Sequence, residues 1–235
     1  MTSVLIIGGG GMIGQKLASS FSTNDSLTLL DIGFPNKNQS NARKIIGSVG
    51  DPEIIENSLK DLPEVIYYLA SVVSGEAEAD FSKGWDVNIH AFWAFLSLVK
   101  KLNEKSQGQY KPKIIFTSSI AVFGSPFPNQ IPDDFIAAPR TSYGAQKASC
   151  ELMLNDFSRK GFCEGLAIRL PTICVRPGKP NLAASSFFSG IIREPLSGIN
   201  AQLPVSTAVR HWHASPRSAV RFLRHAETLN FSQLT

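Results

Sequence analysis

The sequence contains no long hydrophobic run. Although 43% of its 235 residues are hydrophobic, no apolar stretch reaches the roughly 20 residues that a membrane-spanning helix needs. The first residues also lack the features of a secretory signal, because no positively charged stretch precedes the short apolar run at 4–7. We therefore expect a cytoplasmic protein with one substantial core and no contact with membranes.

Cysteine is scarce, and neither sign of charge dominates. The three cysteines, Cys150, Cys163 and Cys174, are odd in number and lack the spacing of metal ligands, so we expect reduced thiols and no metal site. The formal net charge is only +4, and Lys and Arg are scattered along the chain. This distribution does not favour nucleic-acid binding, whereas it suits an anionic small-molecule substrate.

A glycine cluster stands directly after the first apolar run. Gly8, Gly11 and Gly14 are three residues apart, and apolar side chains then recur at helical spacing. In a strand–loop–helix unit, such glycines allow a tight turn, the approach of backbone to a pyrophosphate, and close helix packing. Because glycines also make ordinary turns, the prediction of a dinucleotide-binding loop depends on this context. The loop residues expected to touch the cofactor are Gly8, Gly11, Met12, Ile13 and Gly14.

An acidic residue ends the next apolar run. Residues 27–31 are expected to form a strand that ends in Asp31. An acid about 20 residues after the glycine loop hydrogen-bonds the adenosine ribose in dinucleotide-binding folds. Because Asp31 would repel a 2′-phosphate and is followed by Ile32 rather than Arg, the pattern favours NAD over NADP. The alternative is that Asp31 only caps the end of a strand.

Apolar runs and helical patterns alternate from residue 3 to about residue 175. This alternation predicts an α/β fold with parallel βαβ units in a doubly wound sheet. Ala70 and Ser74 are expected near the cofactor, because they follow the strand predicted at 64–70 and ligands bind at the carboxyl ends of parallel strands. Asp51 starts a helix, where it either caps the helix or meets the adenine edge.

Beyond residue 170, prolines divide the chain into short pieces until a helix expected at 215–229. We therefore expect a Rossmann domain at 1–170 and a small substrate lobe at 171–235. Within the first domain, the helical pattern at 80–103 is apolar on most sides, so it must be covered by the sheet and by a second surface. We expect a homodimer through the helices at 80–103 and 143–160.

Tyr143 and Lys147 stand four residues apart in a helical pattern, which places both side chains on one face. A tyrosine with its ordinary pKa of about 10 is a poor base at neutral pH. A cation beside the phenol lowers its pKa toward the range useful for general acid–base catalysis. Ser119, at the end of the strand expected from residue 113, can orient a substrate oxygen. A Tyr–Lys pair alone is common, and its order after the loop, the acid and the serine makes it a candidate catalytic site.

These features together resemble the extended short-chain dehydrogenase/reductases, a group that includes nucleotide-sugar epimerases. The matching residues are the GxxGxxG pattern at 8–14, Asp31, Asn88, the segment 119–124, and the YxxxK pair at Tyr143 and Lys147. A narrower set of segments resembles the NAD-dependent D-erythronate dehydrogenases, which oxidise C2 of a four-carbon sugar acid to the 2-oxo acid. These segments are 73–80, 118–124, 169–172, 175–181 and 185–187.

The resemblance implies NAD as the cofactor, an acid substrate, and a role for each matching residue. Tyr143 takes the proton of the C2 hydroxyl while the hydride passes to the nicotinamide. Lys147 binds the nicotinamide ribose and lowers the tyrosine pKa, and Ser119 hydrogen-bonds the reacting oxygen. Asn88 holds the active-site helices and a proton-relay water. The residues that the resemblance places beside the cofactor are Ser74, Gly75, Pro171 and Thr172.

An acid substrate needs a cationic partner, and a guanidinium binds a carboxylate through two parallel hydrogen bonds. Arg176 and Arg193 are the candidates in the lobe, and each has the alternative of a solvated surface arginine. Ser74 is also expected near the substrate. Because the family continues beyond the position of Thr235, we expect a shortened substrate lobe with an open pocket.

Two other functions compete with the dehydrogenase. A nucleotide-sugar epimerase or dehydratase shares the cofactor and the Tyr–Lys pair, but it must seat a nucleotide diphosphate, for which the lobe shows no clear basic or aromatic clamp. The second alternative is a non-catalytic Rossmann module that only binds NAD(H).

Overall fold

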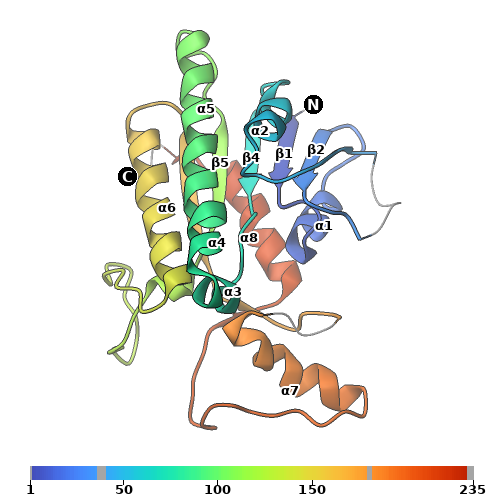
Figure 1. The fold of residues 1–235 in the computed structure, drawn as a ribbon, viewed down its shortest axis with the longest axis vertical. Helices are drawn as coiled ribbons and strands as arrows, with labels where there is room; N and C mark the ends of the chain where they lie inside the picture. Colours follow the sequence, from blue (N-terminus) through green and yellow to red (C-terminus); the bar gives the residue numbers. More distant parts are fainter. Residues whose placement is uncertain (1, 36–40, 179–181, 232–235) are drawn as a thin grey trace.

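The computed structural model describes residues 2–35, 41–178 and 182–231. Its centre is a six-stranded parallel sheet in the order β3-β2-β1-β4-β5-β6 (Figure 1). The chain moves outward from β1 to β3 and then returns to the other side of β1, so the sheet is doubly wound, as predicted. The strands are β1 (Ser3–Ile7), β2 (Ser26–Asp31), β3 (Arg43–Ile46), β4 (Val65–Tyr68), β5 (Lys113–Ser119) and β6 (Glu164–Leu170).

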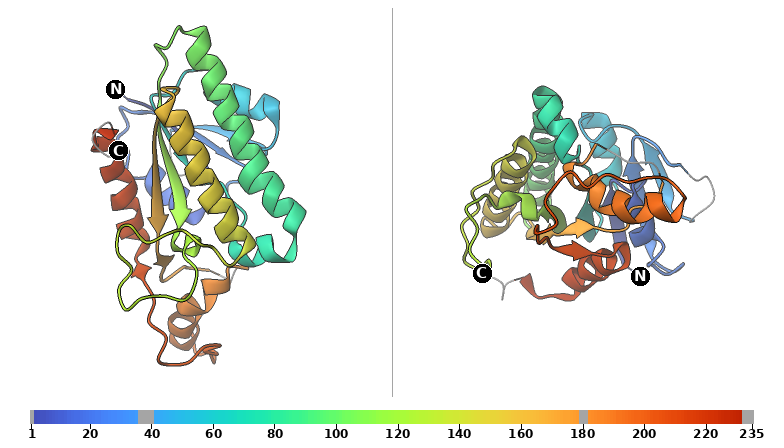
Figure 2. Two further views of the ribbon diagram at one scale, coloured as in Figure 1. Left: turned by 90° about the vertical axis from the view of Figure 1, so that its left-hand side faces the viewer. Right: turned by 90° about the horizontal axis from the view of Figure 1, so that it is seen from below.

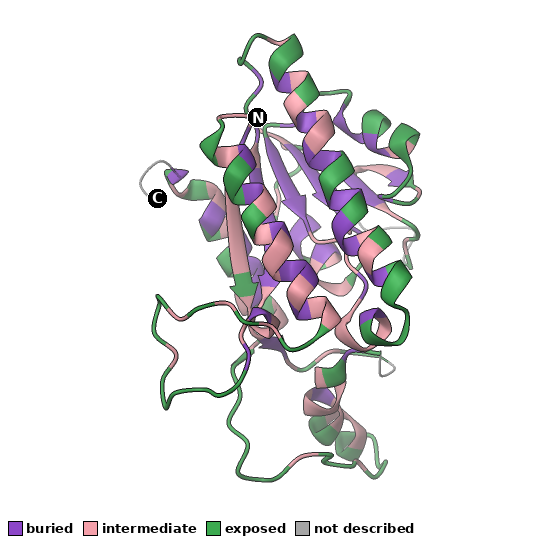
Figure 3. Cartoon of the chain, turned by 60° about the vertical axis from the view of Figure 1, so that its left-hand side comes forward, coloured by how far each residue is buried: buried purple, intermediate pink, exposed green. Residues whose placement is uncertain are grey.

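Helices cover both faces of the sheet, and successive strand residues supply the two faces in turn. Ile7 and Tyr68 face a core shared with α2, α5 and α6, whereas their neighbours Ile6 and Tyr67 face a core shared with α1 and α8. Figure 3 shows the buried residues gathered in the strands and on the inner sides of the helices. Within the described segments, no helix has the length and apolarity needed to cross a membrane. The covering helices are α1 (Met12–Ala18), α2 (Pro52–Leu59), α5 (Ala91–Lys105), α6 (Ser142–Arg159) and α8 (Pro216–Thr228).

The helix predicted at 80–103 is present, but it is not uniform. Asp80 caps its first turn by accepting a backbone amide hydrogen bond, and a π-helical turn then interrupts the α-helical ladder. Phe92 and Phe95 are fully buried against the sheet, whereas Trp93 is 53% exposed. Apolar spacing does not reveal this π turn. The consecutive parts are α4 (Phe81–Trp85), η1 (Asp86–His90) and α5.

The residues after β6 form a small lobe beside the carboxyl edge of the sheet. Helix α7 projects away from this edge (Figure 2), and the two short strands β7 and β8 pair in parallel where the lobe leaves and rejoins the main body. Two short elements, α3 and η2, lie at the carboxyl ends of β4 and β5. The bounds are α3 (Ser74–Ala79), η2 (Ile120–Val122), β7 (Thr172–Ile173), η3 (Ala184–Ser186), α7 (Phe187–Leu196) and β8 (His213–Ala214).

Helix α8 follows the lobe in sequence, but it packs against the sheet. Its Leu223 is fully buried in the core formed with α1 and the central strands. The Tyr67 hydroxyl donates a hydrogen bond to Glu227 Oε2 (2.6 Å), and Lys113 Nζ donates one to the Glu227 carbonyl oxygen (3.0 Å). The end of the chain therefore completes the core of the N-terminal part.

We expect Leu223→Ala to lower the free energy of unfolding by about 2 to 5 kcal/mol, because it leaves a cavity between α8 and the sheet. Chemical denaturation measures this loss. Phe222→Ala is the matched control, since the neighbouring side chain is 47% exposed and should cost less than about 0.5 kcal/mol. Equal losses in the two variants would contradict the packing of α8.

Candidate active site

The glycine loop between β1 and α1 has no room for side chains at Gly8, Gly10 and Gly14. Gly8 has a φ of 90°, and its amide donates to the Leu30 carbonyl oxygen (2.8 Å). A Cβ at Gly14 would lie 2.2 Å from the Gly8 carbonyl oxygen, and one at Gly10 would lie 2.1 Å from the Gly33 carbonyl oxygen. Gly11 begins α1 without a side-chain cap. The backbone thus forms the open cradle that a dinucleotide pyrophosphate requires.

Asp31 lies beside this loop at the end of β2. Its Oδ2 accepts a hydrogen bond from the Gly10 amide (2.9 Å), so the acid and the loop are held in one place. Asp51 caps α2 by accepting a hydrogen bond from the Glu53 amide (3.0 Å). This geometry fits the capping alternative for Asp51, and its contact with the adenine stays a prediction.

Ala70 adjoins the glycine loop at the end of β4. Its amide donates to the Ile7 carbonyl oxygen (3.1 Å), and a Cβ at Gly8 would lie 2.7 Å from that amide nitrogen. Met12 and Ile13 open α1 directly after the loop. Met12, Ile13, Asp31 and Ala70, which were predicted to contact the cofactor, therefore lie next to this loop.

Tyr143 and Lys147 lie one turn apart at the start of α6, as predicted. Thr141 caps this helix by accepting a hydrogen bond from the Gly144 amide (3.1 Å). Lys147 Nζ donates to the Thr117 carbonyl oxygen (2.8 Å) and lies 5.6 Å from the centroid of the Tyr143 ring. The Ser119 side chain also acts on Tyr143, whose pKa it lowers. The fold thus brings the three predicted catalytic groups together at the ends of β5 and α6.

The pKa of Tyr143 differs from the expectation based on sequence. We expected Lys147 to lower it, whereas in this structure burial raises the pKa of Tyr143 above its ordinary value. Ser71, Arg176 and Ser119 act in the opposite direction. Burial also lowers the pKa of Lys147 to about 8. The reason is that the protein interior disfavours both the charged phenolate and the charged ammonium. In addition, Lys147 Nζ donates its hydrogen bond to the Thr117 carbonyl oxygen of β5 and not to the phenol.

Asn88 lies in the π turn and connects three elements. Its Oδ1 accepts hydrogen bonds from the Val72 amide (2.9 Å) and the Ser71 hydroxyl (3.0 Å). Its Nδ2 donates to Gln146 Oε1 on α6 (2.7 Å). Asn88 therefore ties η1 to the end of β4 and to the Tyr143 helix, which agrees with the expected holding role. The proton-relay water stays a prediction.

Sequence reasoning missed Ser71 and Gln146. The Ser71 hydroxyl donates to Asn88 Oδ1 (3.0 Å), and Ser71 lowers the pKa of Tyr143. Its signal in the sequence was a second serine beside Ala70 at the end of a predicted strand. Gln146 lies between the predicted catalytic residues of the YxxxK motif. Its partner is 58 residues away in sequence, so no local pattern could identify it.

Ser74 and Gly75 contact the lobe. The Ser74 hydroxyl accepts a hydrogen bond from the Ala184 amide (3.0 Å), and a Cβ at Gly75 would lie 2.0 Å from the Leu182 carbonyl oxygen. The start of α3 thus supports the lobe segment that begins at residue 182. Contacts of Ser74 with cofactor or substrate stay predictions.

Pro171 and Thr172 lie where the chain passes from β6 into β7. Thr172 is buried, and its hydroxyl lies 2.7 Å from His211 Nε2. The pKa of His211 is lowered, first by burial and then by His213, which favours a neutral imidazole as the partner of Thr172. The expected approach of Pro171 and Thr172 to the nicotinamide carboxamide stays a prediction.

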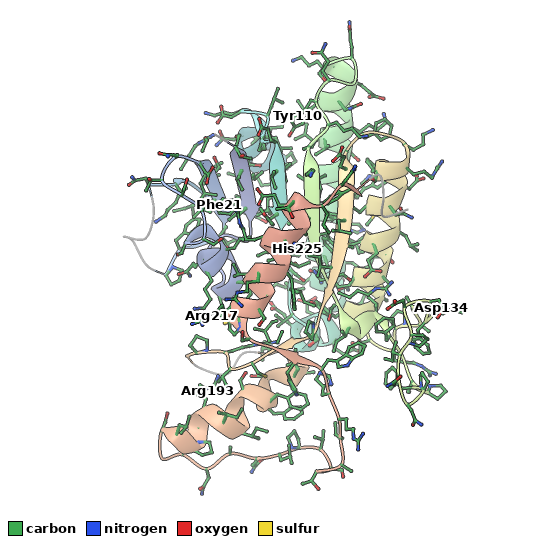
Figure 4. All side chains as sticks on the ribbon, turned by 180° about the vertical axis from the view of Figure 1, so that it is seen from behind. Phe21, Tyr110, Asp134, Arg193, Arg217 and His225 are labelled. Carbon is green, nitrogen blue, oxygen red and sulfur yellow. The ribbon has the colours of Figure 1, made fainter. Side chains whose placement is uncertain are left out.

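The two candidate arginines occupy different positions. The charge of Arg176 acts on Tyr143 and lowers the pKa of its phenol, and Arg176 Nε donates to the Ile173 carbonyl oxygen (3.2 Å). Arg193 lies on α7 (Figure 4). It donates to the Arg176 carbonyl oxygen (2.7 Å) and pairs with Glu194. Arg193 thus supports the backbone of Arg176.

Comparison with known proteins agrees with this geometry. Residues 4–214 match the model of the NAD dependent epimerase/dehydratase family. The chain is 43% identical to a D-erythronate dehydrogenase of Cupriavidus necator, covering 94% of this chain and 70% of that protein. It is 41% identical to a D-erythronate dehydrogenase of Haemophilus influenzae, covering 95% and 71% of the two chains.

A solved structure gives the same result for the fold. The crystal structure described as the nucleoside-diphosphate-sugar epimerase from Agrobacterium tumefaciens superposes with a TM-score of 0.91 at 46% identity. The superposition includes all of this chain and 71% of the Agrobacterium chain. The predicted resemblance, the doubly wound fold and the expectation of NAD are confirmed. On this evidence the chain belongs to the NAD dependent epimerase/dehydratase family.

Proposed function

We propose that the protein is an NAD-dependent dehydrogenase that oxidises the C2 hydroxyl of D-erythronate to the 2-oxo acid. The observation that carries this proposal is the 43% and 41% identity to D-erythronate dehydrogenases along nearly the whole chain. The cluster of Tyr143, Ser119 and Lys147 supports it, because these residues provide a proton acceptor, a hydroxyl donor and a cation at one sheet edge.

In this mechanism Tyr143 takes the proton of the substrate hydroxyl as the C2–H bond breaks and the carbonyl forms. Bound NAD supplies the acceptor for the hydride, and the cradle around Gly8 and Gly14 and the carboxylate of Asp31 would hold its pyrophosphate and ribose. The Ser71 and Ser119 side chains lower the pKa of Tyr143, so they favour the charged phenolate. Both hydroxyls thereby offset part of the effect of burial on Tyr143.

Arg176 is our candidate for binding the substrate carboxylate. It is preferred to Arg193 because its positive charge lowers the pKa of the Tyr143 phenol, whereas Arg193 lies on α7 and donates to the Arg176 backbone. A guanidinium near the proton acceptor can place the C2 hydroxyl of a short acid beside that acceptor.

We expect Arg176→Met to raise the KM for D-erythronate by about 10- to 100-fold, since charged hydrogen bonds are worth about 1.5 to 3 kcal/mol. The KM for NAD should change little. Steady-state kinetics with each substrate varied in turn measures both values. Arg159→Met serves as a control, because Arg159 pairs with Asp156 on the outer side of α6 and is 68% exposed. Equal increases for acid and NAD in Arg176→Met would remove it from this role.

The function is tested by incubating the protein with NAD and a panel of four-carbon acids while NADH absorbance is followed. NADH that appears only with D-erythronate supports the proposal. The Agrobacterium relative favours a second candidate, nucleotide-sugar epimerase, so UDP-sugars form the second arm. Turnover of UDP-sugars alone, or NAD binding without turnover of any compound, would contradict the dehydrogenase.

We also propose that two copies associate through the helices at 80–103 and 143–160. Trp93 on α5 is 53% exposed and Leu152 on α6 is 72% exposed, and exposed large apolar side chains on neighbouring helices favour a protein contact. Sedimentation that shows only monomer at micromolar concentration would contradict the homodimer.

The division into a Rossmann domain at 1–170 and a substrate lobe at 171–235 stays our proposal, with α8 as the part of the second segment that anchors it to the sheet.

The cysteines of the described residues are unpaired. This agrees with the proposed cytoplasmic location, where thiols stay reduced.

A further inference from the structure

Ser118, Glu151 and Arg169 form a second polar cluster, next in sequence to Ser119 and one helical turn from Lys147. The mechanism above does not use it. Glu151 on α6 accepts hydrogen bonds from Arg169 on β6, two from Nε (3.1 and 3.2 Å) and one from Nη2 (2.8 Å). Glu151 also accepts a short hydrogen bond from the hydroxyl of Ser118 on β5. The Glu151 side chain is only 13% exposed, so its charge is held largely away from solvent.

This cluster joins the elements that carry the candidate catalytic groups. Ser118 directly precedes Ser119 at the end of β5, so its bond to Glu151 restrains the strand backbone beside the Ser119 hydroxyl. Glu151 lies one helical turn after Lys147, so the same carboxylate restrains the Lys147 turn of α6. Arg169 connects β6 to this cluster through its ion pair with Glu151. Glu151 therefore links the carboxyl end of β5 to the Lys147 turn of α6.

The charge of Glu151 also acts on Lys147. Burial lowers the pKa of Lys147, and Cys150 and Glu151 oppose that shift. Burial raises the pKa of Cys150 to about 12, so its thiol is neutral at neutral pH, whereas Glu151 forms an ion pair with Arg169. Lys147 also faces the Tyr143 ring within α6 and, from β5, the Thr117 carbonyl oxygen, which does not titrate. Loss of the carboxylate should therefore disfavour the charged lysine.

We propose that Glu151 is a positioning residue for the dehydrogenase reaction: it holds Ser118, and through it Ser119, at a fixed place relative to Lys147 and Tyr143. This inference rests on the proposed function, because it assigns Glu151 to the same site. Glu151 touches neither substrate nor cofactor in this role. Arg169 supplies the counter-charge that keeps the carboxylate in place.

Three variants separate positioning from simple stabilisation. Glu151→Gln removes the charge and breaks the ion pair with Arg169, whose side chain is 36% exposed, so stability falls only modestly. Glu151→Gln/Arg169→Met removes both charges and relieves that unpaired cation. Ser118→Ala keeps the ion pair and removes only the link to β5. Asp156→Asn is the matched control, because Asp156 pairs with Arg159 on the exposed side of the same helix.

We expect Glu151→Gln to lower kcat by about 10- to 100-fold with a smaller change in KM, as misplaced catalytic groups do. The alkaline limb of the pH–rate profile should move to lower pH, since the charged form of Lys147 is lost earlier. In the double variant, Tm should recover while kcat stays low. Ser118→Ala should lower kcat with only the small loss of Tm that follows from removing one hydrogen bond, and Asp156→Asn should change neither.

Recovery of kcat together with Tm in the double variant would show a structural ion pair and overturn the proposal. An unchanged pH profile in Glu151→Gln would do the same. NADH binding, followed by its fluorescence against pH, is measured in parallel. If the wild-type protein does not oxidise D-erythronate, the proposed function fails. The shift of the NADH-binding profile in Glu151→Gln then still decides the role of Glu151 toward Lys147.

Discussion

Tyr143→Phe should lower kcat for D-erythronate by about 10²- to 10⁴-fold, the usual contribution of general acid–base catalysis. The change removes the phenol oxygen, whose pKa is lowered by the Ser71 and Ser119 side chains. The ring itself keeps its place beside Lys147 Nζ, so NAD affinity should change by less than a few-fold. Steady-state rates and NADH fluorescence titration measure the two quantities.

The matched control is Tyr110→Phe. Tyr110 is also buried, but it lies at the end of the molecule opposite the lobe (Figure 4), where its hydroxyl donates to the Pro63 carbonyl oxygen (3.1 Å). This variant should lose stability by about 1 kcal/mol and retain kcat. A Tyr143→Phe protein with near wild-type kcat would remove the phenol from the reaction.

Gly14→Val should destabilise the protein by about 1 to 3 kcal/mol and weaken NAD binding by about 10- to 100-fold. A Cβ at this position would lie 2.2 Å from the Gly8 carbonyl oxygen and 2.8 Å from the Gly9 Cα. These are backbone atoms of the loop, so relief of the clash must displace either the loop or the start of α1. Displacement removes the amides that would face the pyrophosphate.

Thermal unfolding and NADH titration measure the two effects of Gly14→Val. Gly50→Val is the control, because a Cβ at Gly50 would meet only the Ser48 hydroxyl, at 3.5 Å. The control should bind NADH like the wild type. Unaltered NADH affinity in Gly14→Val would show that this loop is not the pyrophosphate site.

Local chemistry explains which parts of the site could be predicted from sequence. The spacing of Gly8, Gly11 and Gly14 follows from contacts within one strand–loop–helix unit, and the structure confirms that side chains cannot fit at Gly8 and Gly14. The alignment of Tyr143 with Lys147 follows from the helical repeat alone. Such features depend on neighbours in sequence, so a pattern is enough to find them.

Burial and distant partners were decided by the tertiary structure. The direction of the Tyr143 pKa shift depends on how deeply the phenol lies and on Ser71, 72 positions before it. The cluster of Ser118, Glu151 and Arg169 comes from three elements that meet only in the folded sheet. These contacts join residues that are far apart in the sequence, so no repeating pattern of residues could reveal them.

The sequence by itself therefore determined the class of fold, the cofactor loop and the Tyr–Lys pair, because repeating local geometry produces each of them. Only the tertiary structure decided that α8 returns to the sheet, that a π turn places Asn88 against α6, and that Glu151 lies behind Ser119. The physical reason is that these features depend on long-range packing and on desolvation, which are properties of the assembled core and not of any one segment.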